Sequence, residues 1–288
     1  MAIARQQVVP AFLVSPAVLS SCLFVLLPVV CIGAYSFWGH MVAGAVDKTL
    51  TLENWRELVK DPFYGSILLR TVRLAATTTV LAVLIGYGPA YYLSTIPAKK
   101  RGILVLMLFL PSWISYIVRT MSWIQILGRN GLVNTALQGL GITNEPIKLL
   151  YNDFAIYVGI LQYVLPIMIL NIYLGLTSVD RNVVDAARTL GANGPQAFFR
   201  VTVPLSMGGL SAGCLICFIW TLGSFVTPML LGGPGTTYYA TLVYENILTQ
   251  QDWPFGSTLA LLSVLFLTVS LAVYGRLMGL SHMFRETR

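Results

Sequence analysis

The chain carries, in a polar interval between two long apolar segments, the sequence Asp185-Ala186-Ala187-Arg188-Thr189-Leu190-Gly191, followed ten residues later by Val201-Thr202-Val203-Pro204. Asp180, just upstream, is of a residue type that caps helix N-termini. Gly191 is placed to end that helix, because glycine readily adopts the left-handed conformation of a C-terminal cap. A second helix is expected to have Pro195 at its first position, where the missing N–H costs nothing. Residues 178–205 are therefore predicted to form a helix-turn-helix loop.

The composition indicates that the rest of the chain lies in a membrane. Hydrophobic residues make up 56% of the chain and charged residues 10%, against about 25% charged in an ordinary soluble domain. A membrane-spanning helix needs roughly 20 apolar residues. The sequence therefore predicts an all-α polytopic membrane protein, with one transmembrane domain over residues 1–288. Its six expected spans lie at about residues 12–37, 72–95, 102–126, 154–177, 206–231 and 255–278.

The distribution of charge between the expected loops predicts the orientation. With a cytoplasmic N-terminus, the inner loops hold ten Lys and Arg against three Asp and Glu, and the other side with the span ends holds eight of each. Lys and Arg accumulate in short cytoplasmic loops. Both termini and the 178–205 loop are therefore expected to be cytoplasmic. The pI near 9.3 reflects this topology, and no nucleic-acid-binding motif is present.

The first apolar segment and the chemically reactive residues favour a membrane subunit without catalysis. Residues 6–46 lack Asp, Glu, Lys and Arg. This interval is longer than a signal-peptide core of about 7–15 residues, so we expect a retained first span.

Cys214 and Cys217 lie within an apolar span, where packing is expected rather than a metal site. His40 and His282 are expected on opposite sides, and no phosphate-binding loop exists, so neither an enzyme nor a bound cofactor is predicted.

The segment from 185 to 204 resembles the EAA loop of bacterial ATP-binding-cassette (ABC) importer permeases. That pattern is Glu-Ala-Ala, three residues, Gly, nine residues and Ile-x-Leu-Pro, and here Asp, Val and Val replace Glu, Ile and Leu. The resemblance implies a coupling loop that docks into a partner ATPase, and small side chains would permit that close approach. An amphipathic loop on the bilayer surface is the alternative. The residues expected to contact the ATPase are Asp185, Ala186, Ala187, Leu190, Gly191 and Pro204.

Other stretches resemble the spermidine/putrescine branch of these permeases. They are Gly86-Tyr87-Gly88-Pro89-Ala90-Tyr91, Leu110-Pro111-Ser112-Trp113-Ile114-Ser115-Tyr116-Ile117-Val118-Arg119-Thr120-Met121-Ser122-Trp123 and Asp252-Trp253-Pro254-Phe255-Gly256. Permeases for opines, ferric iron and aminoethylphosphonate share parts of them and remain alternatives. The resemblance implies a type I (MetI-like) permease fold, a second homologous permease, a periplasmic binding protein and two copies of a cytoplasmic ATPase that holds ATP and Mg²⁺.

An ion-coupled secondary transporter is the alternative from another class. Such carriers couple to H⁺ or Na⁺ through ionisable residues near the bilayer midplane or through broken helices in inverted repeats. No Asp or Glu lies deep in an expected span, and the two halves show no convincing paired motif. The sequence therefore favours the ABC permease.

Candidate path residues follow from the chemistry of a polyamine, whose ammonium groups are attracted by carboxylates and by aromatic faces. Interfacial anchoring is the alternative role of such Trp and Tyr residues. Arg119 is the one charge within the third expected span, and it is expected either to extend to the interface or to line the outer mouth of the path. The other candidates are Trp113, Tyr116, Trp123, Trp220, Tyr238, Tyr239 and Glu245.

Overall fold

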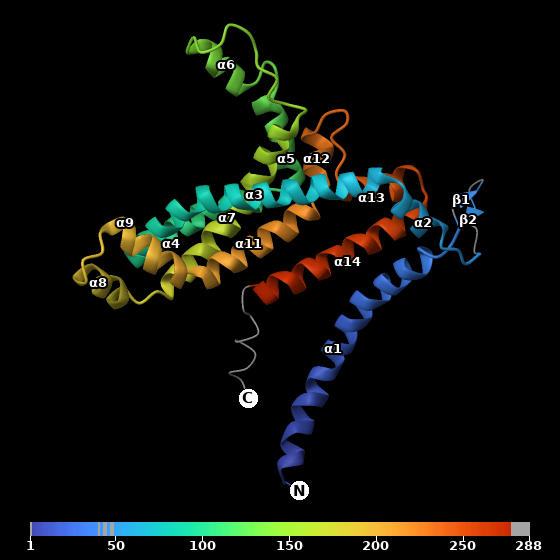
Figure 1. The fold of residues 1–288 in the computed structure, drawn as a ribbon, viewed down its shortest axis with the longest axis horizontal. Helices are drawn as coiled ribbons and strands as arrows, with labels where there is room; N and C mark the ends of the chain where they lie inside the picture. Colours follow the sequence, from blue (N-terminus) through green and yellow to red (C-terminus); the bar gives the residue numbers. More distant parts are fainter. Residues whose placement is uncertain (1, 40, 43–44, 47–48, 278–288) are drawn as a thin grey trace. The chain divides into compact units, whose positions relative to one another are not determined.

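A computed structural model describes residues 2–39, 41–42, 45–46 and 49–277, which are mostly helical (Figure 1). Within these residues, the two strands are β1 (Met41–Val42) and β2 (Ala45–Val46), paired antiparallel with Met41 opposite Val46. The chain forms two compact units, one of residues 1–64 with 243–269 and one of residues 65–242 with 270–288.

The first unit is held by buried polar contacts. It contains α1 (Ala2–Tyr35), α2 (Glu53–Lys60), η3 (Glu245–Thr249) and the first part of α14 (Trp253–Leu277). The side-chain amide of Asn54 donates to the carbonyl oxygens of Ser36 at 3.3 Å and Trp38 at 2.9 Å. The Thr258 hydroxyl also donates to the Ser36 carbonyl, at 3.2 Å. Because buried polar groups need such partners, these bonds tie the segment after α1 to α2 and α14.

The second unit holds most of the remaining helices. The first group is α3 (Pro62–Thr95), α4 (Ala98–Phe109), η1 (Leu110–Trp113), α5 (Tyr116–Leu127), α6 (Leu132–Gly139) and α7 (Asp153–Thr177). The second group is α8 (Arg181–Thr189), α9 (Gly194–Ala197), η2 (Phe198–Thr202), α10 (Val203–Leu205), α11 (Met207–Leu222), α12 (Val226–Leu231) and α13 (Tyr239–Tyr244).

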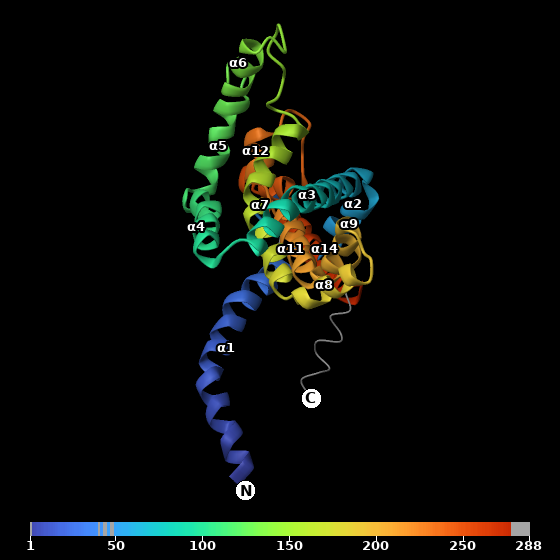
Figure 2. The same ribbon diagram turned by 90° about the vertical axis from the view of Figure 1, so that its left-hand side faces the viewer.

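Helix α7 forms the centre of the second unit. Its residues Ile156, Ile160, Val164, Met168 and Ile172 recur every four positions and are fully buried. Such a stripe is the face that a helix presents to its neighbours. Figures 1 and 2 show α11 beside α7, and this pair packs more extensively than any other in the unit.

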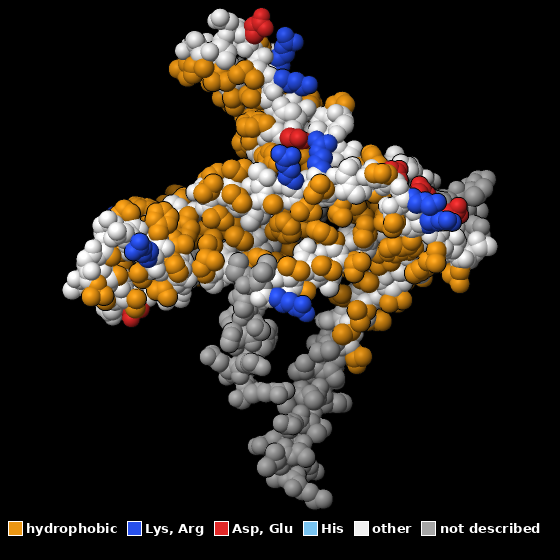
Figure 3. Space-filling view, viewed as in Figure 1, with side chains coloured by type: hydrophobic (Ala, Val, Ile, Leu, Met, Phe, Trp, Pro, Cys, Tyr) orange, Lys and Arg blue, Asp and Glu red, His pale blue; other side chains and the backbone are white. Residues whose placement is uncertain are grey.

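The described helices support a multi-pass membrane protein. Three are long and apolar enough to cross a bilayer, at 62–95, 153–177 and 253–276. Two bent pairs, 98–113 with 116–139 and 194–205 with 207–222, raise this number to five, and Leu19–Tyr35 is a shorter apolar helix. Figure 3 shows hydrophobic side chains over most of one face, with charged side chains confined to a few places. These helices are consistent with the six predicted spans.

Several predicted spans differ from the structure in their limits, and the first, 12–37, corresponds to α1, which covers Ala2–Tyr35. The second helix begins at Pro62 rather than 72, because its basic residues Arg70 and Arg73 lie on the helix. The third is broken after the proline-containing turn η1, where 98–113 and 116–139 are bent by 89°. Figure 1 shows α4 and α5 running in different directions. The last residue of the sixth predicted span, 278, lies outside the described residues.

The fifth predicted span, 206–231, is not one continuous helix. Helix α11 ends at Leu222, and α12 begins only at Val226. The Ser224 hydroxyl lies 3.2 Å from the Tyr116 hydroxyl, and the Thr227 hydroxyl also bonds to it. This polar contact with α5 holds the break in place, since buried hydroxyl groups need partners.

Candidate functional site

The 178–205 loop begins with the predicted capped helix. The Asp180 carboxylate accepts a hydrogen bond from the Asn182 backbone N–H at 2.9 Å and caps α8. At the other end Gly191 has φ +91°, a conformation that glycine adopts without the steric cost of a Cβ. The backbone N–H of Ala192 then donates to the carbonyl of Ala187 at 3.0 Å. The prediction of both helix ends is confirmed.

The second half of the loop forms a continuous but irregular helix. Asn193 and Gln196 exchange side-chain to backbone hydrogen bonds of 2.9 and 3.1 Å, which is a capping box. The helix begins at Gly194, so Pro195 is its second residue rather than its first. It continues through the π-helical turn η2 and through α10, which contains Pro204, and then bends by 66° into α11.

The predicted docking residues lie on the surface of this loop. Asp185, Ala186 and Pro204 are exposed, whereas Ala187 is half-buried. Leu190 is 90% exposed, and Phe199 in η2 is 68% exposed. Large exposed apolar side chains on a polar loop are candidates for contact with a partner protein.

Asp185, which stands where the EAA pattern has Glu, contacts a neighbour on its own helix. Its carboxylate lies 3.3 Å from the Arg188 guanidinium, and both side chains are largely exposed. An exposed pair of this kind adds little to stability. Asp185 therefore remains accessible to a partner protein.

A cavity of about 570 Å³ separates α8 from the ends of α3 and α7. It is lined by Tyr91, Ser94, Thr95, Arg101, Leu176, Thr177, Val179, Val184, Asp185, Arg188 and Thr202. The first helix of the loop is therefore not packed tightly against the spans on this side.

The loop is instead joined to α3 through Phe198. Its ring meets the rings of Tyr87 and Tyr91 edge to face, with centroids 5.4 and 5.5 Å apart. The Tyr87 hydroxyl also lies 2.9 Å from the Ser206 hydroxyl, at the junction of α10 and α11. Movement of the second loop helix would therefore be transmitted directly to α3.

Three of the predicted path residues meet at a tyrosine that the sequence reasoning missed. Tyr163 of α7 stacks with Trp220 of α11 at 4.5 Å and 20°, and Tyr116 of α5 meets it edge-on at 5.0 Å. We call Tyr116, Tyr163 and Trp220 the aromatic cluster. The Arg119 guanidinium carbon lies 5.2 Å from the centre of the Tyr163 ring. The available signal was a polar aromatic residue inside the apolar 154–177 span.

The other predicted path residues lie apart from this cluster. Trp113, in η1, is 79% exposed. Trp123 packs beside Leu127 and Leu150 in a second apolar cluster. Tyr238 and Tyr239 are buried. Glu245 begins the π-helical turn η3 in the first unit.

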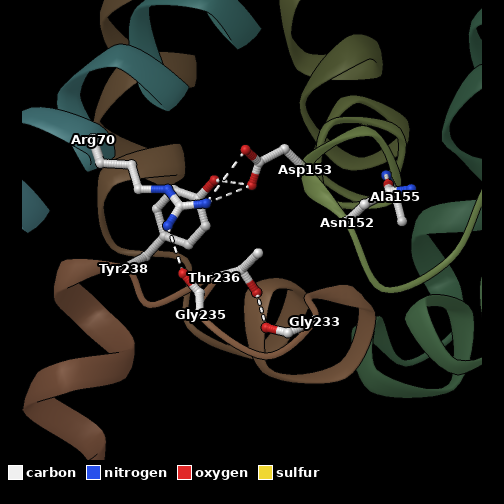
Figure 4. Close-up of polar contacts among 8 residues, drawn as sticks. All are labelled: Arg70, Asn152, Asp153, Ala155, Gly233, Gly235, Thr236 and Tyr238. Atoms are coloured by element: carbon white, nitrogen blue, oxygen red, sulfur yellow. Dashed lines mark hydrogen bonds and ion pairs between the residues drawn. The ribbon is translucent and has the colours of Figure 1, made fainter.

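A charged cluster in the second unit holds Tyr238 in place (Figure 4). The Arg70 guanidinium donates to Asp153 at 3.0 and 3.3 Å and to the Gly235 carbonyl at 2.7 Å. The Tyr238 hydroxyl donates to the same carboxylate at 3.0 Å, and Arg70 lies over the Tyr238 ring. Burial and the Asp153 carboxylate raise the pKa of Tyr238, so its hydroxyl remains a donor at neutral pH.

Sequence reasoning missed the pairing of Arg70 and Asp153. Its signal was that these opposite charges lie at the ends of two predicted spans, 72–95 and 154–177. Their bonds tie α3, the start of α7 and the glycine-rich segment 232–235 together.

A bundle of apolar helices that carries an exposed helix-turn-helix loop of the EAA pattern defines a permease subunit of an ABC importer. The family of binding-protein-dependent transport system inner membrane components matches residues 82–279. The chain belongs to this family.

Named relatives lie within the same class of subunits, which are permeases and not enzymes. The spermidine/putrescine transport system permease protein PotB of Haemophilus influenzae is 33% identical over 88% of this chain and 88% of its own. PotB of Escherichia coli is 32% identical over 88% of this chain and 92% of its own. The putative 2-aminoethylphosphonate transport system permease protein PhnU of Salmonella paratyphi A is 23% identical over 84% of this chain and 86% of its own.

A solved structure shares the fold. A chain of a bacterial alginate ABC transporter, crystallised with its alginate-bound periplasmic protein, has a TM-score of 0.74. The match covers 96% of this chain and 95% of that chain at 14% sequence identity. The predicted type I permease fold is therefore confirmed.

Proposed function

We propose that this chain forms half of the translocation path of an ABC importer for polyamines such as spermidine and putrescine. The observation that carries the substrate class is the 32–33% identity, over 88% of the chain, to permeases named for these two compounds. The whole chain acts as one transmembrane domain. It pairs with a second homologous permease and receives substrate from a periplasmic binding protein.

Coupling to ATP occurs through the 178–205 loop. Ala186 and Ala187 permit close approach of a partner surface, and the exposed Leu190 gives that partner an apolar contact. Two copies of a cytoplasmic ATPase bind ATP and Mg²⁺, whereas this chain binds no cofactor. Phe198 passes the motion of the docked loop to α3 through Tyr87 and Tyr91.

Docking is tested by adding bulk to the loop. Ala187→Arg should abolish ATPase co-purification and uptake while the permease still inserts, because a long charged side chain prevents close approach. Ala136→Arg, at an exposed position of α6, is the matched control and should retain the ATPase. An Ala187→Arg variant with parental uptake would show that the loop does not dock in this way.

The substrate is tested with the importer reconstituted with its binding protein. ATP-dependent uptake of labelled putrescine and spermidine is expected. Uptake of an opine, ferric iron or aminoethylphosphonate in their place would move the assignment to those branches. Uptake by the purified chain alone, driven by an ion gradient without ATP, would indicate a secondary transporter.

In the proposed orientation, both termini and the coupling loop face the cytoplasm of a bacterial cell. The support is the excess of Lys and Arg over Asp and Glu in the loops assigned to that side. Single cysteines at positions 98 and 193 of a cysteine-free variant should resist an impermeant thiol reagent added outside, and one at 144 should react. Labelling of position 193 in intact cells would reverse the orientation.

A further inference from the structure

The aromatic cluster brings three helices together around one cation. Tyr116, Tyr163 and Trp220 come from α5, α7 and α11, and the guanidinium of Arg119 lies over the Tyr163 ring. A cation within about 6 Å of a ring centre is attracted by the negative face of the ring. The cluster is therefore a formed binding site for a positive charge, and a side chain of the protein occupies it.

Arg119 is held differently from the other arginines that lie over rings in the described part of the chain. Arg70, over Tyr238, is also bonded to Asp153 and to a backbone carbonyl. Arg101, over Tyr173, donates to two backbone carbonyls at 2.9 and 3.1 Å. These bonds fix both guanidinium groups in their positions.

Among the residues that the structure describes, Arg119 has no such bonds. Its Nε atom is buried without a hydrogen-bond partner, and within the described residues its side chain forms no ion pair. A buried donor without an acceptor is costly, so the ring contact is the polar interaction that holds this guanidinium within the described residues. Little opposes its departure when another cation competes for the same ring.

The rings themselves are held independently of Arg119. The Tyr116 hydroxyl bonds to the hydroxyls of Ser224 and Thr227, which fix this side chain at the break between α11 and α12. Trp220 stacks on Tyr163 and is still 43% exposed. The site therefore keeps its shape when the guanidinium leaves, and one of its rings is open to an incoming ligand.

We propose that the aromatic cluster is a binding site for an alkylammonium group and that Arg119 occupies it as a resident cation until substrate displaces it. This rests on the proposed function, in which the substrate is a polyamine. Arg119 then determines specificity by competition. A substrate with two or more ammonium groups gains additional attraction elsewhere, whereas a single small cation competes poorly with the tethered guanidinium.

The test is direct binding to the purified importer complex in detergent, without the binding protein, measured by isothermal titration with putrescine, methylammonium and the neutral analogue 1,4-butanediol. Arg119→Met removes the resident charge and keeps an apolar side chain of similar reach. It should tighten putrescine and methylammonium binding at least threefold and leave 1,4-butanediol unchanged. Arg129→Met, at an exposed position after α5, is the matched control and should bind as the parent does.

A second pair of variants separates binding from folding. In the Arg119→Met background, Tyr163→Leu should remove the gain, whereas Tyr163→Phe should keep it because the ring face remains. An Arg119→Met variant that elutes as an intact complex but binds putrescine equally or more weakly overturns the proposal. If the importer transports no polyamine but Arg119→Met still gains methylammonium affinity, the proposed function fails and the ammonium site stands.

Discussion

The close approach of α7 and α11 gives a quantitative prediction. A Cβ atom added at Gly209 of α11 would lie 2.6 Å from the Cα of Gly175 on α7, and closer still to the carbonyl oxygen of Asn171. Ordinary van der Waals contact begins at 3.4 Å. Gly209→Ala must therefore move one backbone away from the other by about 0.8 Å or more, since neither atom belongs to a flexible side chain.

The cost of this change follows from the atoms that it displaces. Adding a methylene-sized group to a well-packed core costs about 1–3 kcal/mol, and more where backbone must move. Small residues at helix interfaces in membranes allow the backbones to approach closely. This matters because helix association inside a bilayer depends on van der Waals packing and not on the hydrophobic effect. Separating α7 from α11 also weakens contacts along the most extensive helix pair of the unit. We therefore expect Gly209→Ala to lower the free energy of unfolding by about 3 kcal/mol or more.

The neighbouring glycine is a control on the same helix. A Cβ at Gly208 would meet nothing within 4 Å, so Gly208→Ala should be neutral or should stabilise by up to about 1 kcal/mol through helix propensity. The measurement is thermal unfolding of the purified complex together with the amount of each variant in the membrane. Equal melting temperatures for the two variants would show that α7 and α11 do not pack at this distance.

Three further predictions concern the loop, the charged cluster and substrate charge. Phe198→Ala should leave the ATPase bound but lower uptake per ATP severalfold, and unchanged coupling would refute the role of this ring. Arg70→Gln should lower the melting temperature only modestly, because a partly exposed ion pair contributes about 0–1 kcal/mol, and a large loss would show that the pair closes a buried site. Glu245→Gln should slow uptake more than basal ATP hydrolysis, with a larger loss for spermidine than for putrescine. An equal loss for both substrates would argue against attraction by this carboxylate.

The 178–205 loop was predictable because its structure is encoded locally. The cap at Asp180 and the turn at Gly191 each depend on residues within one or two helical turns, and both occur as the sequence predicts. Pro195 marked the start of the second helix to within one residue. No distant contact is needed to place these elements.

The break in the fifth span and the aromatic cluster depended on distant contacts and were not predictable in this way. In the sequence, Ser224 and Thr227 are ordinary residues of an apolar segment. Their role depends on hydrogen bonds to Tyr116, which lies more than 100 residues earlier. Tyr163 has no charged or glycine-rich neighbours that distinguish it in the sequence. Hydropathy reports which segments enter the membrane, but it carries no information on which faces of those segments meet.

In the proposed function, helix α7 connects the loop to the aromatic cluster. Asp153, Tyr163 and Gly175 lie at the start, the middle and the end of this one helix, so at 1.5 Å per residue about 15 and 18 Å separate them. Gly175 packs against α11, which follows directly from the second helix of the loop. Ile156, Ile160 and Ile172 are buried along the whole length of α7, so its packing against its neighbours runs from one end of the helix to the other. We expect a displacement of the loop to reach the Tyr163 ring through this backbone packing.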